Sequence, residues 1–368
     1  MPTFSSGFQR DVLLHLSSIA MGATPSMKMT VSGFLEMLLM TRRNNQLTQN
    51  IDNGTGALKS VSVKYKERGI DSSVVDTDDC DVDVITAFKE KEVFPTLFSK
   101  LGIFISVTKL EKYTEDAVTT VRAGKPATVF MQDFLDDLIT QSQALVSKMD
   151  KLLLAKQALN FGINQVTGSA ATTTVNIDQD KTVNDLTTGL TKILADAMYN
   201  EMSGPLHIVG SGLFNNYNLQ QAVNGLAQNG VDTSRFTGYK FHNDMWAQAA
   251  WGINQIGIFE EGSVKLVEAS KIGLLKPELT PGPSQFFTMP LPVQGQTGLL
   301  SVDFDVQLKF IDCPTEVLVN GVPTVVDRGW LLMPKKLYDL FNLPDDAYNA
   351  ADRLTGNNGT LRYTITNS

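Results

Sequence analysis

The sequence contains few of the residues that form disulfides or bind metals. Its 368 residues include two cysteines, Cys80 and Cys313, and three histidines, His15, His207 and His242. Two cysteines so far apart make neither a disulfide framework nor a metal-binding motif, which favours a reducing compartment such as the cytosol. No histidine has a partner at the spacing of known ligand motifs. We therefore expect no bound metal, and nothing in the sequence predicts a cofactor.

Basic charge and long apolar runs are also missing. The net charge is -8 at pH 7, which disfavours a dedicated duplex-DNA binder but permits passive proximity to packed nucleic acid. No stretch comes near the roughly 18 consecutive apolar residues that suggest a membrane span, and the N-terminus lacks the basic region of a signal peptide. We expect no membrane association. Because 42% of the residues are hydrophobic, the chain can bury a sizeable core, or two subdomains that share one.

Sequence motifs for catalysis are incomplete. Gly210, Ser211 and Gly212 follow a predicted strand, but the third glycine of a dinucleotide loop, a Gly-Lys-Ser/Thr sequence and the spacing of GxSxG are all missing. A strand-to-helix turn with a serine cap explains this segment better. No nucleophile, base and orienting group are linked by the sequence, so we expect no catalytic residues and no enzyme.

An acidic run is the strongest local signal. Read from Asp79, the acidic residues Asp81, Asp83 and Glu90 fall at offsets like those of a calcium-binding EF-hand loop. The position that needs glycine for the sharp turn is Val84, and strand alternation also explains why acids and valines interleave. A solvated or neighbour-facing acidic edge is therefore favoured over a calcium site.

The first third of the chain predicts a helix and then a ribbon. Residues 31–43 have helical spacing of apolar residues, with basic residues at the C-terminal end. Val61, Val63 and Tyr65 then alternate with polar residues, and valines in 74–84 indicate a return strand. This pattern predicts a long two-stranded ribbon with a polar tip. Its apolar content is too small to bury both faces, so we expect it to lean on another surface, which could belong to a neighbouring subunit.

A long helix is predicted over residues 126–162. Proline suits its first turn and glycine its end. About 35 residues at about 1.5 Å each would span on the order of 50 Å, and two shorter helices that meet near 141–147 are the alternative. The apolar residues that repeat every seven positions are Met131, Leu138, Leu145, Leu152 and Leu159.

A compact α+β unit is predicted over residues 182–292. Before it, the apolar segment 94–113 is expected to join a core sheet, and 164–180 reads as a connection. The unit closes with a Gly/Pro-rich stretch, 276–292. The predicted elements inside it are helices 184–202 and 213–226 and strands 205–209, 239–241 and 256–259.

The C-terminal part predicts mainly strands. Residues 299–311 alternate as one long strand, and a hairpin is expected over Asn320 and Gly321. A helix near 335–341 and a final strand at 361–365 complete the predicted elements.

Charged side chains along the ribbon are the candidate contact residues. Basic residues on the first strand would face acidic residues on the return strand, either in cross-strand pairs or in a salt-dependent contact with a neighbour. We expect Trp246 and Trp251 to lie in the core or a subunit interface rather than to line a ligand site, and His207 to be a core residue. The candidate contact residues are Lys59, Lys64, Lys66, Arg68, Asp76, Asp78, Asp79, Asp81 and Asp83.

The order of these elements resembles that of the major capsid proteins of tailed phages with the Hong Kong 97-like fold, which encapsulins share. The segment VKYKERGIDSSVVDTDDC is similar in texture to capsid proteins of phages that infect Bacteroidota. The resemblance implies an α+β fold with five parts. These are an N-terminal arm with short helices (1–50), an E-loop ribbon (51–93), a peripheral domain (94–181) with a spine helix (126–162), an axial domain (182–292), and a peripheral return strand with a C-terminal extension (293–368).

The resemblance implies a function by self-assembly. Hexamers and pentamers of the chain would build an icosahedral shell around the phage genome, in the host cytoplasm during assembly and in the virion capsid afterwards. The implied partners are other copies, a portal, and scaffold or decoration proteins. A tail or sheath protein and an encapsulin-like compartment remain as alternatives, and a cytosolic enzyme is the least favoured one.

Overall fold

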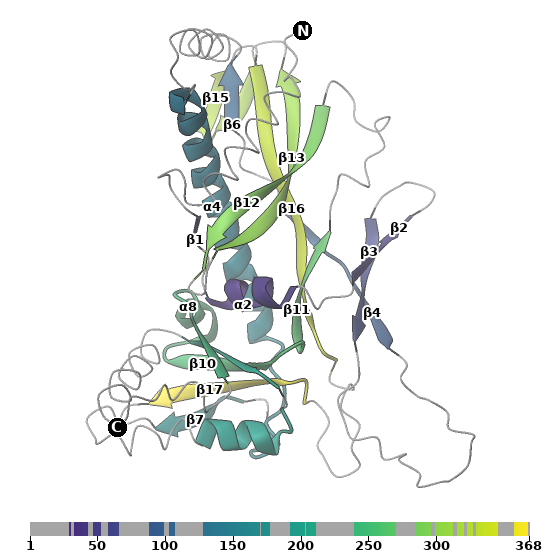
Figure 1. Ribbon diagram of the computed structural model, residues 1–368, viewed down its shortest axis with the longest axis vertical. Helices are drawn as coiled ribbons and strands as arrows, with labels where there is room; N and C mark the ends of the chain where they lie inside the picture. The colour runs from purple at the N-terminus through teal and green to yellow at the C-terminus, as the bar shows by residue number, and fades with distance from the viewer. Residues whose placement is uncertain are drawn as a thin grey trace.

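The computed structural model is a mixed α/β structure of two large sheets and a smaller one, as expected for an α+β chain (Figure 1). The structure describes residues 29–30, 33–42, 47–52, 58–65, 88–98, 103–106, 128–169, 171–176, 192–202, 204–210, 239–269, 284–295, 299–311, 315–319, 322–326, 329–344 and 357–366. The predicted helix 213–226, the Ser211–Gly212 turn, the return strand 74–84, the acidic run and both cysteines lie outside these residues.

A seven-stranded sheet forms the upper body of the molecule in Figure 1. Its centre is the pair β13 and β16, which are joined antiparallel, and the predicted strand 299–311 coincides with β13. The predicted participation of 94–113 in a core sheet is confirmed, because two short strands from this segment pair with β16. The strands are β1 (Met29–Thr30), β5 (Thr96–Phe98), β6 (Ile103–Ser106), β11 (Val264–Ala269), β12 (Ser284–Gln294), β13 (Leu299–Ile311) and β16 (Gly329–Asn342).

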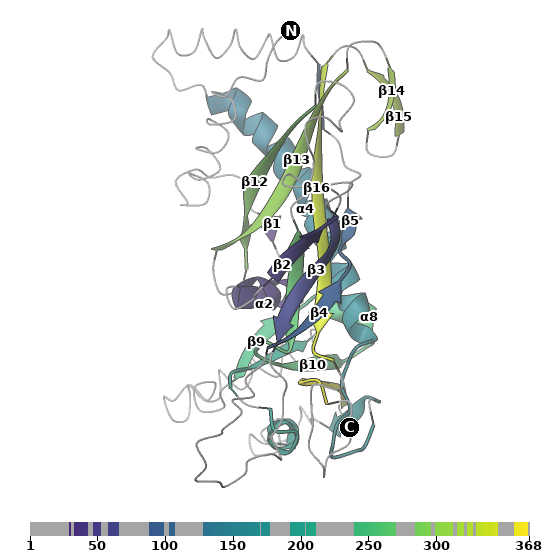
Figure 2. The same cartoon turned by 90° about the vertical axis from the view of Figure 1, so that its right-hand side faces the viewer.

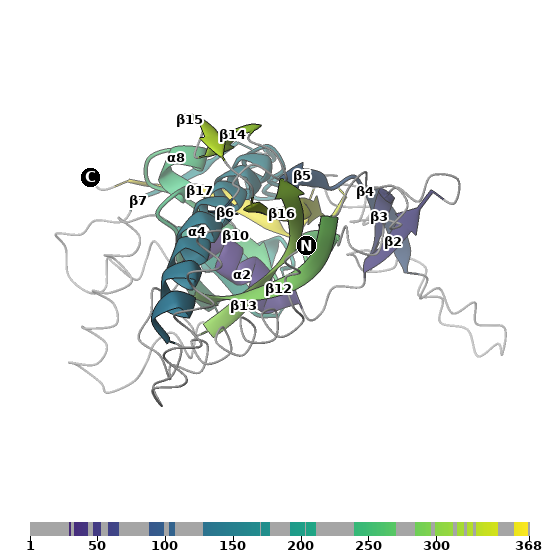
Figure 3. The ribbon, with the colours of Figure 1, turned by 90° about the horizontal axis from the view of Figure 1, so that it is seen from above.

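One helix, α4 (Thr128–Ala158), runs without interruption along this sheet (Figure 3). The alternative of two helices that meet near 141–147 is therefore wrong. At 31 residues the helix is much longer than an average globular helix. Of the predicted repeat, Leu145 is buried and Leu152 is partly buried, whereas Leu159 lies just after the helix and is 86% exposed. The helix ends close to Gly162, where the sequence predicts its end.

A five-stranded sheet forms the lower unit. Its order is β7-β17-β10-β8-β9, and its core is a cluster of apolar side chains from the sheet and from the helical residues 192–199. The predicted strands 205–209, 239–241, 256–259 and 361–365 are confirmed. The strands are β7 (Thr173–Asn176), β8 (Leu206–Gly210), β9 (Tyr239–Asn243), β10 (Gln255–Glu260) and β17 (Thr360–Thr366).

The two units exchange segments along the chain. Strand β17 inserts between β7 and β10 of the lower sheet, although it comes from the C-terminal end. Strand β11 and most of β12 lie before residue 292 yet belong to the upper sheet. The chain therefore passes between the units more often than the expected ranges 182–292 and 293–368 imply.

Buried amides lock β17 to the neighbouring segments. Asn200 donates through Nδ2 to Asn164 Oδ1 at 2.9 Å, and Asn357 donates to the Asn200 carbonyl at 2.9 Å. Asn358 donates to the Asn160 carbonyl, also at 2.9 Å. Because a buried amide without partners is costly, this mutual pairing fixes the end of α4 against the start of β17.

Helix α2 (Gly33–Thr41) lies at the neck between the two units (Figure 1). The predicted helix 31–43 contains it, and its apolar residues Phe34, Leu35, Leu38 and Leu39 are buried as predicted. Burial extends all around the helix, because α2 touches β8 and β9 of the lower sheet and β11 and β13 of the upper one. A helix enclosed on every side carries no polar face for solvent.

Three segments predicted as connections or as a helix are strands instead. The helix predicted near 335–341 is wrong, because this segment belongs to β16 and pairs with β11 and β13. Its apolar residues lie on both faces of the strand, and such a run cannot be distinguished from a helix by periodicity. Part of the connection 164–180 forms β7, which runs parallel to β17.

The third of these segments is β12, within the Gly/Pro-rich stretch 276–292. It contains Pro290 and Pro292, and proline is tolerated only at a sheet edge because it donates no ladder hydrogen bond. The neighbour of β12 on the side away from β13 is the two-residue β1, which pairs only with Val293 and Gln294. The prolines thus lie where no donor is required.

The predicted hairpin over Asn320 and Gly321 is confirmed. Strands β14 (Thr315–Val319) and β15 (Val322–Val326) pair antiparallel, with Val319 opposite Val322; Asn320 and Gly321 themselves lie outside the described residues. The hairpin forms a separate two-stranded sheet that stands beside the upper body in Figure 2.

Candidate functional site

The predicted ribbon is a three-stranded sheet in the described residues. Strand β2 (Leu47–Ile51) pairs with β3 (Leu58–Tyr65), and β3 pairs with β4 (Lys89–Val93). The prediction of a two-stranded ribbon missed β2, because Gln49 and Asn50 look like the start of a polar loop. We call β2, β3 and β4 together the ribbon sheet; it stands at the side of the body in Figure 1.

The inner face of the ribbon sheet packs on the chain's own body. Val61, Val63 and Tyr65 alternate onto this face, and they join a buried cluster with Val267 of β11 and Phe341 of β16. The rings of Tyr65 and Phe341 lie 5.7 Å apart. The expectation that the ribbon leans on another surface is thus met within one chain for this part of the ribbon.

A buried lysine fastens the sheet to the body. Lys265 of β11 donates from Nζ to the Lys64 carbonyl of β3 at 3.0 Å. Burial lowers the pKa of Lys265 from its ordinary value, because the charged form loses solvation. β2 begins at Leu47, which pairs with Val63, so the body supplies a donor beside this end of the described β2–β3 ladder.

The outer face of the ribbon sheet is polar. Asn50 donates from Nδ2 to Ser60 Oγ at 3.0 Å and to Ser62 Oγ at 2.9 Å, so one amide spans two rungs of β3. Lys64 and Glu90 are directly opposite in the register, and their charged groups are 3.4 Å apart. Both side chains are about half exposed, so this pair contributes little to stability and leaves its charges accessible.

The predicted contact residues are only partly within the described residues. Lys59 is exposed on β3, and Lys64 pairs with Glu90 of β4. Lys66, Arg68 and the five aspartates lie outside the described residues. The sequence prediction missed β4, where the alternation of lysine and glutamate over residues 89–92 could have indicated an exposed edge strand.

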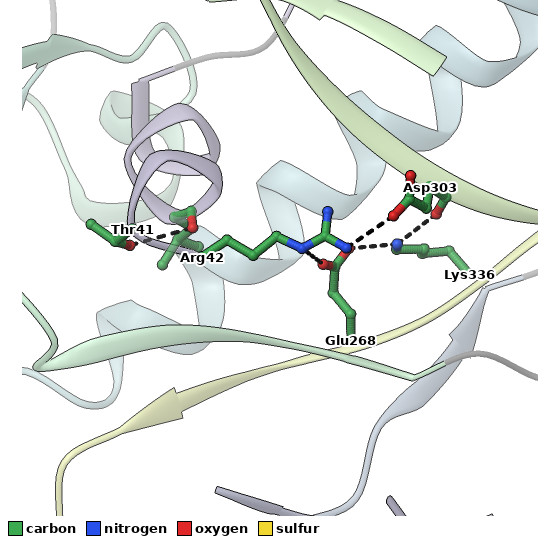
Figure 4. A network of polar contacts seen from close by, with 6 residues as sticks. Thr41, Arg42, Glu268, Asp303 and Lys336 are labelled. Atoms are coloured by element: carbon green, nitrogen blue, oxygen red, sulfur yellow. Dashed lines mark hydrogen bonds and ion pairs between the residues drawn. The ribbon is translucent and has the colours of Figure 1, made fainter. Parts of the chain in front are cut away.

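A charged network joins α2 to the upper sheet near the ribbon (Figure 4). The Arg42 guanidinium lies 2.7 Å from Glu268 Oε2 and 2.9 Å from Asp303 Oδ2. Lys336 contacts the other oxygen of Glu268, and its Nζ also donates to the Asp303 carbonyl. Glu268 and Lys336 are buried, and each is matched by opposite charge, which is the condition under which buried ions are tolerated.

Trp251 belongs to the core, as predicted. It lies at the end of α8 (Ala247–Trp251), and its ring meets Phe34 of α2 and Phe161 in edge-on contacts with centroids 5.9 and 5.3 Å away. Its Nε1 donates to the Leu154 carbonyl of α4 at 3.0 Å. Trp246, just before α8, is covered by Lys151, whose Nζ is 3.7 Å from the ring centroid. Both rings have protein partners rather than open space around them.

His207 is a core residue, as predicted, and it has a partner that the sequence did not indicate. Its Nδ1 lies 2.9 Å from Nε2 of His242, and the two rings stack. Burial, His242 and Lys240 lower the pKa of His207 from 6.5 to about 4. His207 is therefore held as a neutral ring near pH 7.

Large apolar side chains are exposed at several separate elements. Phe94 after β4 is 65% exposed, and Met245 and Ile253 on either side of α8 are 68% and 69% exposed. Others lie at the end of α4 and beside the helical residues 192–199, namely Leu159, Met198 and Tyr199. Single exposed apolar residues are ordinary, but this many at separate elements give the chain several places where a partner could bury area.

The described residues show neither a metal-binding cluster nor a membrane-spanning helix. Among the described residues, no group of three or more histidine, cysteine, aspartate or glutamate side chains is arranged to hold a metal ion. None of the helices within the described ranges is both long and apolar enough to cross a membrane.

Known proteins give only distant likeness. No family model matches the sequence, and no curated protein does. The capsid structure of the cyanophage P-SCSP1u matches 94% of this chain and 91% of its own at 11% identity, with a TM-score of 0.44. The capsid of cyanophage A-1(L) matches 93% and 94% at 12% identity, with a TM-score of 0.43. A virus-like particle from Pyrococcus furiosus matches 96% of both chains at 8% identity, with a TM-score of 0.34.

Proposed function

We propose that the chain is a major capsid protein of a tailed phage with a Hong Kong 97-like fold. Copies would assemble through hexamers and pentamers into an icosahedral shell around the phage genome. The carrying observation is the arrangement of the ribbon sheet, which is anchored on one face by its own body and whose outermost described strand, β4, carries exposed charges.

The order of elements fits this proposal. The ribbon sheet would be the base of the E-loop, and α4 with the seven-stranded sheet would be the peripheral domain. The five-stranded unit would be the axial domain, with β17 as a strand contributed by the C-terminal part. We keep the proposed roles of the ranges 51–93, 94–181, 182–292 and 293–368. The exception is that some strands of one range join the sheet of another.

Exposed apolar residues at separate elements support many neighbours rather than one. A shell subunit meets several copies at once, and each contact can be weak because closure multiplies them. Phe94 follows β4 of the ribbon sheet and Ile253 follows α8 beside the lower sheet, so we assign the two residues to different subunit contacts. In the proposed shell each would be covered by a different neighbour.

The charges on β4 also favour a contact with a different surface of the neighbouring subunit over a contact between two copies of β4. When two copies of one strand pair antiparallel about a two-fold axis, odd-numbered residues face odd-numbered residues and even-numbered residues face even-numbered ones. For β4 this places lysine opposite lysine and glutamate opposite glutamate at Lys89 to Glu92, which is unfavourable. The charges on the outer edge of β4 therefore disfavour a symmetric dimer through this strand. Head-to-tail contacts in a ring avoid this pairing of like charges.

Electron microscopy of the expressed full chain tests the proposal. We expect closed shells, capsomer rings or curved sheets. Tubes would support a tail or sheath protein instead, and a monodisperse monomer at high concentration would overturn the proposal. The portal, scaffold and decoration partners belong to the same proposal, and co-expression with the neighbouring structural proteins of the phage would test them.

Single substitutions separate assembly from folding. Phe94→Asp and Ile253→Asp change side chains that are exposed in one copy. The free energy of unfolding of the subunit should therefore stay within about 0.5 kcal/mol of the wild-type value. Assembly should fail, because each aspartate would place a charge in a subunit contact. Ser301→Asp, at an exposed position of β13, is the matched control and should still assemble. Normal shells from both test variants would contradict the assignment of these contacts.

A further inference from the structure

A buried chain of three titratable side chains connects α2 to the edge of the lower sheet. Strands β8 and β9 are parallel neighbours, which brings His207 and His242 together with ring centroids 5.2 Å apart. His242 Nδ1 in turn lies 3.9 Å from Oε2 of Glu36 on α2. His207 is 2% exposed, and His242 and Glu36 are fully buried. These three residues are called the histidine chain below.

The hydrogen-bonding possibilities favour one arrangement of protons. A single hydrogen occupies the 2.9 Å contact between His207 Nδ1 and His242 Nε2. If His207 donates it, His242 carries its own proton on Nδ1, which faces the Glu36 carboxylate. The reverse arrangement would direct the bare lone pair of His242 Nδ1 toward a carboxylate oxygen. The first arrangement is therefore favoured, and it leaves His207 Nε2 as a buried acceptor without a hydrogen-bond partner.

A proton added on acidification would go to that unpartnered nitrogen. His207 would become an imidazolium ion that is buried, stacked on a second ring and on the same strand pair as Lys240. Such a charge is tolerated only with solvent or a counter-ion. The nearest acid of the histidine chain, Glu36, is separated from His207 by the His242 ring. Protonation thus favours any state in which His207 reaches water.

A charge on His207 would act at the neck between the two units. Helix α2 contacts β8 and β9, and Gly33 lies so close to β9 that an added Cβ would come within 2.6 Å of the Asn243 carbonyl oxygen. We propose that the histidine chain is an acid-sensitive latch, which holds α2 against the β8–β9 edge at neutral pH and releases it when His207 takes up a proton.

The charged groups on the surrounding elements set the sign. Lys240 on β9 repels a proton from His207, and Glu36 on α2 lies 3.9 Å from His242 Nδ1. The other charged groups of the elements packed around the pair are Asp244 after β9, Asp150 and Lys151 on α4, and Glu260 on β10. Asp244 is engaged by amides at the starts of α2 and α8. Burial, His242 and Lys240 all lower the pKa of His207, so His207 in the closed latch takes up a proton only well below pH 6.5.

Hydrogen exchange on the full chain tests the latch. Protection factors of α2, β8 and β9 would be compared with those of β13, in the wild type and in His207→Asn, between pH 7 and pH 4. Asparagine keeps a donor near the Nδ1 position but does not titrate. In the wild type we expect protection at the latch to fall on the order of a few hundred-fold relative to β13 as pH drops from 6.5 to 4. In His207→Asn the fall should be less than about tenfold.

Equal pH profiles in the two proteins, or a loss spread evenly over β13 as well, would overturn the latch. A second measurement covers the case in which His207→Asn does not fold at pH 7. Imidazole nitrogen shifts of the wild type report the titration of each ring and its tautomer directly. A His207 that titrates near pH 6.5, or a His242 without a proton on Nδ1, would also overturn it. Neither measurement requires a shell, so the latch and the proposed capsid function can fail separately.

Discussion

Asp244 accepts a hydrogen bond of 2.8 Å through Oδ2 from the backbone N–H of Phe34, a residue that lies 210 positions earlier in the chain. Its other oxygen accepts from the N–H groups of Trp246 and Ala247 at 2.8 and 3.0 Å. One carboxylate therefore satisfies amides at the starts of two helices, α2 and α8, that are remote in sequence. Free amides at a helix start carry partial positive charge, so the carboxylate also has favourable electrostatics.

Replacing this carboxylate should loosen the neck. We expect Asp244→Ala to lower the free energy of unfolding by about 2–4 kcal/mol, because three buried amides lose their acceptor. Asp244→Asn keeps one oxygen acceptor and should lose about half as much. Urea unfolding of both variants measures the difference. A loss below about 0.5 kcal/mol in the alanine variant would show that water replaces the carboxylate without cost.

Asp150 on α4 gives the neck an opposite pH dependence. Burial first, and Asp244 second, raise the pKa of Asp150 well above the ordinary 3.8. A raised pKa means that the folded state binds the proton more tightly than the unfolded state does. The stability contribution is therefore complete below pH 3.8 and is lost as pH rises toward the folded-state pKa.

Asp150→Asn should remove this loss. The variant resembles the protonated acid, so it should be more stable than the wild type at pH 7 and nearly equal to it at low pH. Unfolding free energies measured at several pH values between 3 and 8 test the expectation. Glu90→Gln, at an exposed position of the ribbon sheet, serves as the control and should leave the pH profile unchanged. A variant that is less stable than the wild type at pH 7 but equal to it at pH 3 would contradict this expectation and would mean that the charge of Asp150 stabilises the neck.

Gly33 sets how closely α2 approaches β9. An added Cβ would lie 2.6 Å from the Asn243 carbonyl oxygen and 2.8 Å from two carbonyl carbons, all of which are backbone atoms that cannot rotate away. Gly33→Ala should therefore cost about 1–3 kcal/mol, although alanine favours helix more than glycine does. Gly262→Ala provides a comparison, since its Cβ would meet no atom but its φ of 89° disfavours alanine. A neutral Gly33→Ala would imply that α2 can shift outward.

Strand patterns with one buried face could be predicted from the sequence. Residues 299–311 alternate strictly, and Val302 and Phe304 are buried while Ser301 is exposed, so period-two spacing alone located β13. The long helix could also be predicted from the sequence, because its seven-residue repeat extends over many turns. Both elements are long and strongly periodic, and few alternatives fit them.

Contacts between distant segments could not be predicted. Leu337, Tyr338, Leu340 and Phe341 have helical spacing but lie in a strand, since β16 has partners on both sides and buries both faces. Likewise β2 has few strand-forming residues, and its pairing depends on the Asn50 contacts with Ser60 and Ser62. The stacking of His207 on His242 follows from the pairing of β8 with β9, which no local pattern in either segment contains.

The charged network at the neck should depend on both buried members. Lys336→Met removes one of the two cations that face Glu268 and leaves Arg42, which is partly exposed. We expect a loss of about 2–4 kcal/mol. Removing both buried ions, in Lys336→Met with Glu268→Leu, should cost less than the single change, because no buried charge is left unmatched. A double-mutant cycle in urea measures the coupling, and strictly additive losses would show that the two ions act independently.

The Lys265 contact should control how firmly the ribbon sheet is held. Lys265→Met keeps the apolar stem but removes the donor to the Lys64 carbonyl. Exchange of β3 and β4 amides should accelerate about fivefold, as expected for one hydrogen bond of about 1 kcal/mol. Global stability should change little, since the buried charge with its lowered pKa is removed at the same time.

Lys59→Met is the matched control for this change, because Lys59 is an exposed lysine on β3 itself. It should leave the exchange of β3 and β4 unaltered. If the proposed shell is correct, Lys265→Met should also assemble with more varied curvature, because the ribbon sheet would meet its neighbour at a less fixed angle. Exchange that is equally fast in both variants would place the anchor in the apolar cluster of Val61, Val63 and Tyr65 rather than in the lysine.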